Sequence, residues 1–459
     1  MAVQPLIAVR ALAPEGGGPD LTAFWRIAAF LTLSVVLGSF GGAVTGEKTT
    51  FLFKEVMHLT PGDIGTLGIL VGIPAYLQPF LGAGSDLFPL FGSHRRSYYV
   101  LSVLVRTGAY WGLACLSQYH YIAVVCLLLV LASGGVLATV MVNAIMVAVG
   151  NRTRRLGQLQ SLIVFVPAVL SILYTAHLSG YVTQHWSYHH AYSLAAALML
   201  LHLPLTLLID EKSIVGQSRA DPARRREERR EERREERARS LAALREAARL
   251  PGLWAVIGLV FYLILTPGVG NAQIYYMTDV LHFSKQLIGS LGMFSSAGAI
   301  VSMGLFAAFS RRLPVWSLVW GAWGMDCIGY PILVLLHTPD SAKVIYFLGA
   351  CIGTWYSLCL FTLAARACPP GVEGAVYGLV MSAIAIAGVL SDKIGGNMYD
   401  YFGPLNTAHH WTITHGWDYS LWVGLAFTLV GFVFIPFLPA WAKSREPLGG
   451  PGGPRAEGA

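Results

Sequence analysis

Long apolar stretches separated by short polar ones run through the whole chain. A helix needs roughly 20 mostly apolar residues to cross the hydrocarbon core of a bilayer. Twelve segments meet this requirement: Phe24–Thr45, Ile64–Gly84, Tyr98–Leu116, Ile122–Gly150, Leu159–Val182, Ala191–Leu208, Leu253–Ile274, Leu287–Phe309, Val315–Leu336, Val344–Cys368, Val376–Met398 and Leu421–Pro439. The sequence therefore predicts an all-α membrane protein with twelve transmembrane helices.

The polar segments between these helices divide into two alternating sets by their charge. One set is rich in arginine and the other carries a few lysines: Arg95, Arg96, Arg152, Arg154, Arg155, a central arginine run, Arg311, Arg312 and Arg366 against Lys48, Lys54, Lys285 and Lys343. Loops rich in basic residues face the cytoplasm, so the first set predicts the cytoplasmic side. An even number of helices places both termini there, and we expect a bacterial inner-membrane protein.

A hydrophilic stretch divides the predicted helices into six and six. Its core, Arg224–Arg239, reads RRREERREERREERAR, and such charge runs are usually solvated linkers, so we expect no nucleic-acid binding. The predicted organisation is a cytoplasmic segment at 1–23, six-helix halves at 24–209 and 251–441, a charged cytoplasmic linker at 210–250 and a disordered cytoplasmic tail at 442–459. Two similar halves predict a substrate site between them, near the middle of the membrane.

Composition excludes a soluble protein and gives no sign of an enzyme. Hydrophobic residues make up 55% and charged residues 12% of the chain, whereas soluble domains average about a quarter charged residues. The sequence has no GxSxG, HExxH or P-loop motif. The six cysteines form no CxxC pair, and two groups of histidines, at 185–190 and 409–415, lack a Cys or carboxylate partner. We therefore predict no enzymatic activity, no cofactor and no metal site.

The loop after the second predicted helix has the features of a gate. It reads GAGSDLFPLFGSHRRSYY from Gly82 to Tyr99. Asp86 falls at the end of a helix that runs inward, where the negative end of the helix dipole disfavours a carboxylate. Its candidate partners are Arg95, Arg96 and the start of the eleventh helix near Glu373, whose free N–H groups favour an anion. Such a contact would hold the two halves together on the cytoplasmic side, and the alternative is an ordinary topology-setting loop.

The seventh predicted helix is interrupted in the middle of the membrane. Thr266-Pro267-Gly268 break it, and Asn271, Gln273 and Tyr275 follow at once. Backbone groups freed at this depth are tolerated only where they are buried or line a cavity. Interrupted helices that carry polar residues indicate a transport site, so we predict that these three side chains bind substrate. A proline kink with tyrosines at the outer interface is the alternative.

Three further side chains are candidate substrate contacts. Thr139 and Asn143 lie four residues apart in the fourth helix and therefore on one face. Trp355 in the tenth helix can stack on a planar ligand. Helix–helix packing is the alternative for all three.

Charged residues inside the predicted helices are few. Asp326 lies mid-way along the ninth helix and Asp392 in the outer part of the eleventh, beside Lys393. Ionisable groups in a membrane mark functional sites unless they form structural pairs. We predict that Asp392, with Asp326 as the second candidate, carries a coupling proton.

Three stretches resemble the folate-biopterin transporter group of the major facilitator superfamily: Phe53–Tyr99, Thr266–Ser284 and Cys368–Ala383. The most specific of them contains SDxxPxFGxxRRxY, which begins at Ser85. The resemblance implies the twelve-helix facilitator fold in two halves. It also implies proton-linked movement of folates, pterins or related compounds.

The sequence departs from this group at two places. Positions that are acidic in the fourth helix of the group are Thr139, Asn143 and Ala148 here. The acid that follows the break in the seventh helix is replaced around Gly270–Asn271.

These patterns favour a secondary transporter that moves a small organic solute, folate- or pterin-like or another organic anion, by alternating access. The expected partners are that solute, membrane lipid and a proton, and the expected state is a monomer. The alternative is a non-transporting protein of the same fold that acts as an assembly or scaffold factor. The missing membrane acids favour this alternative, whereas the gate loop and the interrupted helix favour transport.

Overall fold

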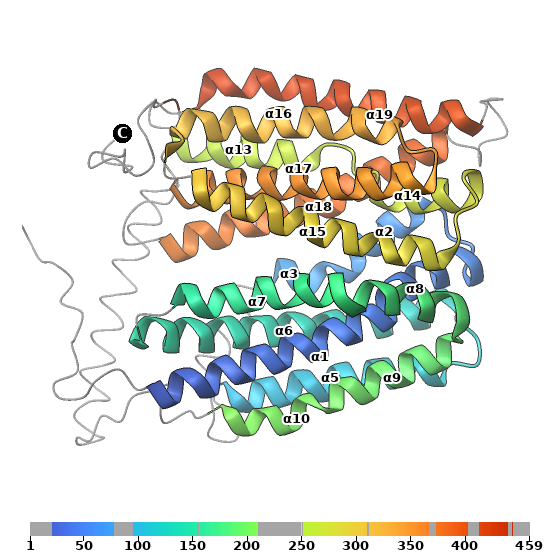
Figure 1. Ribbon diagram of the computed structural model, residues 1–459, viewed down its shortest axis with the longest axis vertical. Helices are drawn as coiled ribbons and strands as arrows, with labels where there is room; N and C mark the ends of the chain where they lie inside the picture. The colour runs from blue at the N-terminus through green and yellow to red at the C-terminus, as the bar shows by residue number, and fades with distance from the viewer. Residues whose placement is uncertain are drawn as a thin grey trace, which may run out of the picture.

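The computed structural model describes residues 21–77, 95–153, 156–209, 251–309, 312–366, 373–402 and 413–438, together with residues 249 and 443. Within these ranges every regular element is a helix, and the helices lie side by side along one direction (Figure 1). Those of the first half, drawn blue to green, and those of the second half, drawn yellow to red, form two groups, with α2 of the first half lying against α18 of the second. The predicted all-α architecture is confirmed.

The first half contains five membrane-length helical stretches and the shorter pair α2 and α3. Several stretches are built from consecutive pieces: α1 Leu21–Phe51 with the π-helical turn η1 Leu52–Val56, α2 Pro61–Val71 with α3 Ile73–Tyr76, α5 Arg96–Cys115, α6 Tyr121–Thr153, α7 Leu156–Leu170 with η2 Ser171–Thr175 and α8 Ala176–His185, and α9 Tyr188–Leu200 with α10 His202–Leu205 and η3 Thr206–Leu208.

The second half begins with the interrupted helix and continues with five more helical stretches. Their bounds are α13 Pro251–Leu265 with α14 Gly270–Tyr275 and η4 Tyr276–Val280, α15 Lys285–Phe309, α16 Val315–Val334, α17 Pro339–Arg366, α18 Glu373–Phe402, and α19 Ile413–Val430 with η7 Gly431–Phe437.

Nine helical stretches of the described residues are long and apolar enough to cross a membrane. The other three predicted spans correspond to α5, α16 and the α2–α3 pair. Helices α5 and α16 have 20 residues each, a length of about 30 Å that matches the hydrocarbon core. The predicted second span continues past residue 77, beyond the described range. The helices are therefore consistent with twelve spans.

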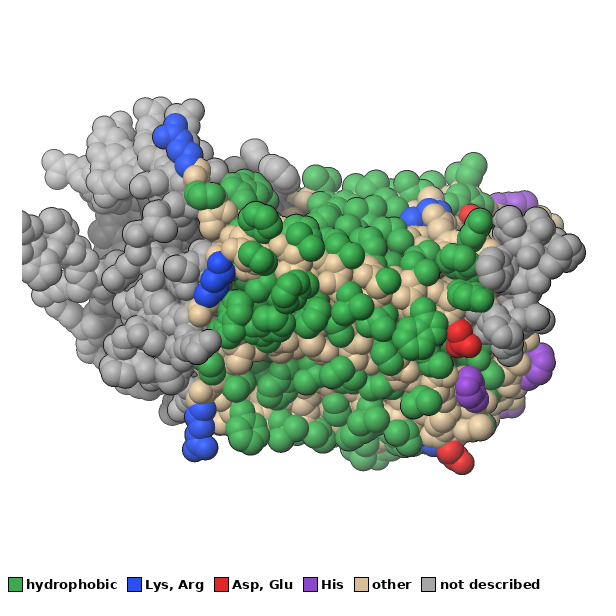
Figure 2. Space-filling view, turned by 90° about the horizontal axis from the view of Figure 1, so that it is seen from above, with side chains coloured by type: hydrophobic (Ala, Val, Ile, Leu, Met, Phe, Trp, Pro, Cys, Tyr) green, Lys and Arg blue, Asp and Glu red, His purple; other side chains and the backbone are tan. Residues whose placement is uncertain are grey.

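The outer surface has the banding of a membrane protein. Figure 2 shows hydrophobic side chains over the middle of one face, Lys and Arg side chains at the end where α1 begins, and acidic and histidine side chains near the opposite end. We call the end where α1 begins and η7 ends the linker end.

The opposite end, which we call the closed end, is where residues 51–62 of the first half contact residues 275–286 of the second. The largest hydrophobic cluster lies here and draws on both halves, including Phe51, Leu52, Tyr275 and Trp417. Trp417 stacks on Tyr276 with ring centroids 4.6 Å apart.

Two other clusters lie within single halves, around Phe30 and Leu259 respectively. Elsewhere the halves meet mainly along α2 with α18 and along α8 with α15. The largest hydrophobic cluster thus joins the two halves at the closed end.

Candidate functional site

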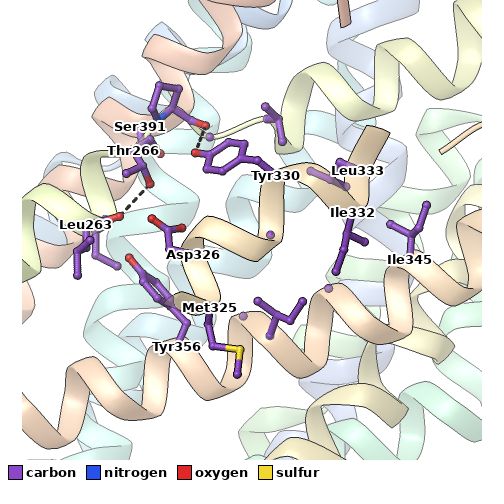
Figure 3. Close-up of a pocket in the computed structure, with 18 residues that line it drawn as sticks. Leu263, Thr266, Met325, Asp326, Tyr330, Ile332, Leu333, Ile345, Tyr356 and Ser391 are labelled. Carbon is purple, nitrogen blue, oxygen red and sulfur yellow. Dashed lines mark hydrogen bonds between the residues drawn. The ribbon is translucent and has the colours of Figure 1, made fainter. Parts of the chain in front are cut away.

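The interruption of the seventh helix is stabilised by hydrogen bonds to its neighbours. Helix α13 ends at Leu265, and α14 resumes at Gly270. Proline lacks the N–H that would continue the helix ladder, so Pro267 enforces the break. The Gly268 N–H donates to the Ser391 carbonyl oxygen (3.0 Å), and the Ser391 hydroxyl donates to the Thr266 carbonyl oxygen (2.5 Å). The Tyr330 hydroxyl donates to the Pro267 carbonyl oxygen (2.8 Å, Figure 3). The freed carbonyls therefore have donors, as burial in a membrane requires.

A cavity of about 440 Å³ lies between the two halves, where the sequence predicted a substrate site. Most of its walls are apolar, and its polar lining comes from both halves: Thr49, Thr50, Phe53, Ile64, Gly65, Leu67, Gly68, Val71, Gly72, Leu128, Asn271, Val389 and Asp392. We call it the central cavity. It brings together two of the predicted site residues, Asn271 just after the break and Asp392 on α18. A concave, mostly apolar site with a few polar groups is the usual form of a small-molecule site.

The fourth-helix candidates lie on the cavity face of α6 but outside the cavity itself. Leu128 lines the cavity, and Thr139 and Asn143 follow it by eleven and fifteen residues. An α-helix turns by about 100° and rises about 1.5 Å per residue. Thr139 and Asn143 therefore point within about 60° of the direction of Leu128, and they lie roughly 16 and 22 Å nearer the linker end. Both side chains are exposed, and the Thr139 hydroxyl donates to the Gly135 carbonyl oxygen (3.0 Å).

The remaining predicted substrate contacts lie away from the central cavity. The Tyr275 hydroxyl donates to the Leu59 carbonyl oxygen of the first half at the closed end. Gln273 is half-buried and does not line the cavity. Trp355 packs edge-on against Phe306 inside the second half, with centroids 5.3 Å apart.

The predicted cytoplasmic gate lies partly outside the described residues. Asp86 falls in the undescribed range 78–94. The Arg95 guanidinium donates to the Ala144 carbonyl oxygen (2.7 Å) and so ties the start of α5 to α6. Arg96 is the first residue of α5, and Glu373 is the first of α18. The gate across the halves therefore stays a prediction.

Two ion pairs, which sequence reasoning missed, cross between the halves at the closed end. Lys54 contacts the Asp279 carboxylate (Nζ–Oδ1 2.5 Å) and the Thr278 hydroxyl. Lys285 contacts the Glu55 carboxylate (2.6 Å). In each pair, one residue belongs to the first half and the other to the second.

The segments that carry these pairs are repeats of one another, 224 residues apart. Residues 55–60 read EVMHLT, and residues 279–284 read DVLHFS. Each segment begins in the last two residues of a π-helical turn and contains a histidine with positive φ, 52° at His58 and 53° at His282. A matching hydrogen bond closes each turn, from the Leu59 N–H to the Phe53 carbonyl oxygen (2.9 Å) and from Phe283 to Met277 (2.8 Å). This internal repeat is the sequence signal that could have located the closed end.

Glycines allow the two halves to approach backbone to backbone. A Cβ at Gly65 of α2 would lie 2.6 Å from Lys393 Cα of α18. A Cβ at Gly289, the repeat equivalent of Gly65, would overlap the backbone of Gly180 on α8. Small residues at helix interfaces are the means by which membrane helices pack closely.

A second pocket, of about 320 Å³, lies within the second half beside the break (Figure 3). It is lined by α13, α16, α17 and α18, and it contains Asp326. The Thr428 hydroxyl of α19 donates to the Asp326 carboxyl oxygen (3.2 Å). Asp326 and Asp392, the two predicted coupling acids, therefore lie in different cavities on opposite sides of the break.

A family model described as the BT1 family matches residues 26–326 and 346–431. The chain belongs to this family. Among its relatives, a folate-biopterin transporter of Synechocystis sp. is 28% identical over 83% of this chain and 76% of its own length. A probable folate-biopterin transporter 7 of Arabidopsis thaliana is 25% identical over 77% of this chain and 81% of its own. The resemblance to the folate-biopterin group is confirmed.

Solved structures of low sequence identity share the fold of this BT1 family member. A bacterial homologue of the human lysosomal transporter Spinster gives a TM-score of 0.65 at 15% identity, covering 91% of this chain and 97% of that one. A D-xylose–proton symporter gives 0.62 at 16% identity, covering 93% and 100%. The chain thus has the major facilitator fold. The family and its relatives, together with the apolar helices, make it a multi-pass membrane transporter of a small molecule and not an enzyme.

Proposed function

We propose that this protein is a secondary transporter that moves a pterin- or folate-like organic anion by alternating access. The observation that carries the proposal is the central cavity, which lies between the halves and is lined by both Asn271 and Asp392. The relatives named as folate-biopterin transporters support the substrate class. Both halves of the site belong to one chain, so we propose that a monomer suffices.

The lining of the central cavity suits a flat heterocycle with polar edges. Phe53, Ile64 and Leu128 are among its apolar walls, and apolar walls favour a planar ring. A pterin carries adjacent ring and amino N–H groups, and a carboxylate such as Asp392 can accept two such hydrogen bonds. The Asn271 amide can donate to a ring carbonyl oxygen and accept from an N–H.

The closed end and the basic linker end together suggest an inward-facing state. Basic loop residues face the cytoplasm, so we place the linker end and both termini there, in a bacterial inner membrane. The exposed Thr139 and Asn143 would then line the route from the central cavity to the cytoplasm. Opening the other side requires the Lys54–Asp279 and Lys285–Glu55 pairs to part. Ion pairs with exposed members contribute only about 0–1 kcal/mol each, so closure rests mainly on the hydrophobic cluster of the closed end, which draws on both halves.

The proposed substrate site is tested by thermal unfolding of purified protein in detergent with pterins, folates, nucleobases, sugars and amino acids. A ligand that binds only the folded protein raises the unfolding midpoint. We expect a pterin or folate to do so. Asn271→Ala should weaken its apparent affinity roughly three- to tenfold, since a net hydrogen bond contributes about 0.5–1.5 kcal/mol.

Gln273→Ala is the matched control, because Gln273 lies two residues away on α14 and does not line the cavity. It should leave the pterin response unchanged. If a different solute raises the midpoint and Asn271→Ala weakens that effect, the proposed site stands and the substrate is that solute. Equal responses in both variants would remove Asn271 from the site.

A further inference from the structure

Asp326 is a carboxyl group inside a membrane-spanning half with no basic residue in its pocket. The described residues that line this pocket include no Lys, Arg or His. The neighbouring side chains that face Asp326 are neutral hydroxyls, of which Thr428 donates to its carboxyl oxygen (3.2 Å). An ionised carboxylate at such a position is costly unless a positive charge accompanies it.

The C-terminal end of α13, the part of the seventh helix before the break, also favours a positive charge in this pocket. Helix α13 ends at Leu265, beside the pocket. Figure 3 shows the Asp326 carboxyl between Thr266 and Tyr356, close to the last turn of α13. The C-terminal end of a helix carries partial negative charge, and broken helices in transporters use such ends and their free carbonyls to bind Na⁺ or H⁺.

We propose that this pocket binds one monovalent cation on Asp326, either a proton or Na⁺, and that this cation is coupled to transport. The coupling rests on the transport function proposed above, whereas the binding itself does not. Oxygen atoms suited to a hard cation surround the site: the Asp326 carboxyl, the Thr266 and Thr428 hydroxyls and the Tyr330 and Tyr356 hydroxyls.

Among the described residues that line the pocket, no other side chain is a carboxyl. The titratable neighbours are Tyr330 and Cys327 on the same helix and Tyr356 on α17. The hydroxyls of Thr266 in the break, Ser391 on α18 and Thr428 on α19 stay neutral. Among these groups the carboxyl is the one that can ionise near neutral pH and then take up a proton or Na⁺, because the ordinary pKa values of tyrosine and cysteine side chains lie above 7.

The break in the seventh helix connects the pocket to the central cavity. On the pocket side, Tyr330 donates to the Pro267 carbonyl oxygen. Gly268 and Thr266 also bond to Ser391, which lines the pocket and whose neighbour Asp392 lines the central cavity. A Cβ at Gly268 would lie 2.8 Å from Asp392 Oδ1. A charge change at Asp326 can therefore shift the break and the cavity wall together, through contacts that are contiguous.

The test measures cation binding without any organic solute. Binding of radioactive sodium to purified protein at constant ionic strength, with choline as the replacement cation, tests for Na⁺. The infrared C=O band of a protonated carboxyl tests for a bound proton. We expect one of the two signals in the native protein and at least a tenfold weaker Na⁺ affinity, or loss of the C=O band, in Asp326→Asn.

Two further variants keep the result interpretable. Asp340→Asn removes an exposed acid that pairs with Lys343 (2.7 Å) at the closed end, and it should change neither signal. Thr428→Val keeps the acid and removes its donor, so it should weaken Na⁺ binding or shift the C=O band even if Asp326→Asn does not fold. Absence of both signals, or signals that persist in Asp326→Asn, would overturn the cation site. Failure of the solute panel with a positive cation signal would instead count against the proposed substrate alone.

Discussion

Gly289→Ala is expected to lower substrate uptake into proteoliposomes by at least about fivefold while the protein remains folded. The added methyl group would overlap the backbone N and Cα of Gly180, neither of which can rotate away. Helices α8 and α15 must then separate. We expect the Lys285–Glu55 pair, formed by the first residue of α15, to separate as well. Overpacking of this kind costs about 1–3 kcal/mol, enough to shift a two-state balance by roughly 5- to 150-fold.

A neighbouring glycine supplies the control for this experiment. A Cβ at Gly292, one turn further along α15, would lie 3.6 Å from Ala176 Cβ, an ordinary contact. Gly292→Ala should therefore keep uptake within about twofold of native. Spin labels at the exposed positions Val56 and Tyr401 should report a longer distance in Gly289→Ala only. Native uptake and native distances in Gly289→Ala would show that closure does not depend on this contact.

Gly395→Ala is expected to lower the thermal unfolding midpoint and to remove the response to pterin. A Cβ at Gly395 on α18 would overlap the carbonyl oxygen of Gly268 in the break. The bonds between the break and Ser391 hold both cavities in shape, so displacing Gly268 disturbs the two cavities together. The expected destabilisation is about 1–3 kcal/mol or more, since backbone rather than a side chain must move.

Gly388→Ala is the matched substitution on the same helix. Its Cβ would meet Ile264 Cγ2 at 4.0 Å, which is ordinary van der Waals contact. Thermal unfolding in detergent should separate the two variants, with Gly388→Ala close to native. Equal midpoints for Gly388→Ala and Gly395→Ala would mean that the break is not held by its contact with α18.

The membrane spans could be predicted because bilayer thickness dictates their length. The predicted segment Ile122–Gly150 corresponds closely to α6, Tyr121–Thr153. The first span was predicted to end at Thr45, yet α1 continues to Phe51. The sequence places Lys48 in a loop, but its ammonium donates to the carbonyl oxygens of Thr183 (3.1 Å) and Trp186 (2.5 Å), which satisfy it within the bundle. Such partners are not visible from hydropathy.

The candidate site could be predicted only in part. The break at Pro267 and the polar Asn271 were visible, because proline and glycine interrupt a helix wherever they stand. The cavity that joins Asn271 to Asp392 was not, because it depends on how α14 and α18 pack against α1 and α2. The closed-end ion pairs join residues more than 220 positions apart, and the EVMHLT and DVLHFS repeat indicates them only once internal repeats are compared.

Uptake of labelled biopterin and folate into proteoliposomes that contain the native protein tests whether this protein is a transporter. We expect saturable uptake of at least one of them, retained by Gly292→Ala and strongly reduced in Gly289→Ala. Folded protein that takes up neither compound, nor any other solute of the panel, would contradict alternating-access transport. That result would instead favour an assembly or scaffold role for the same fold.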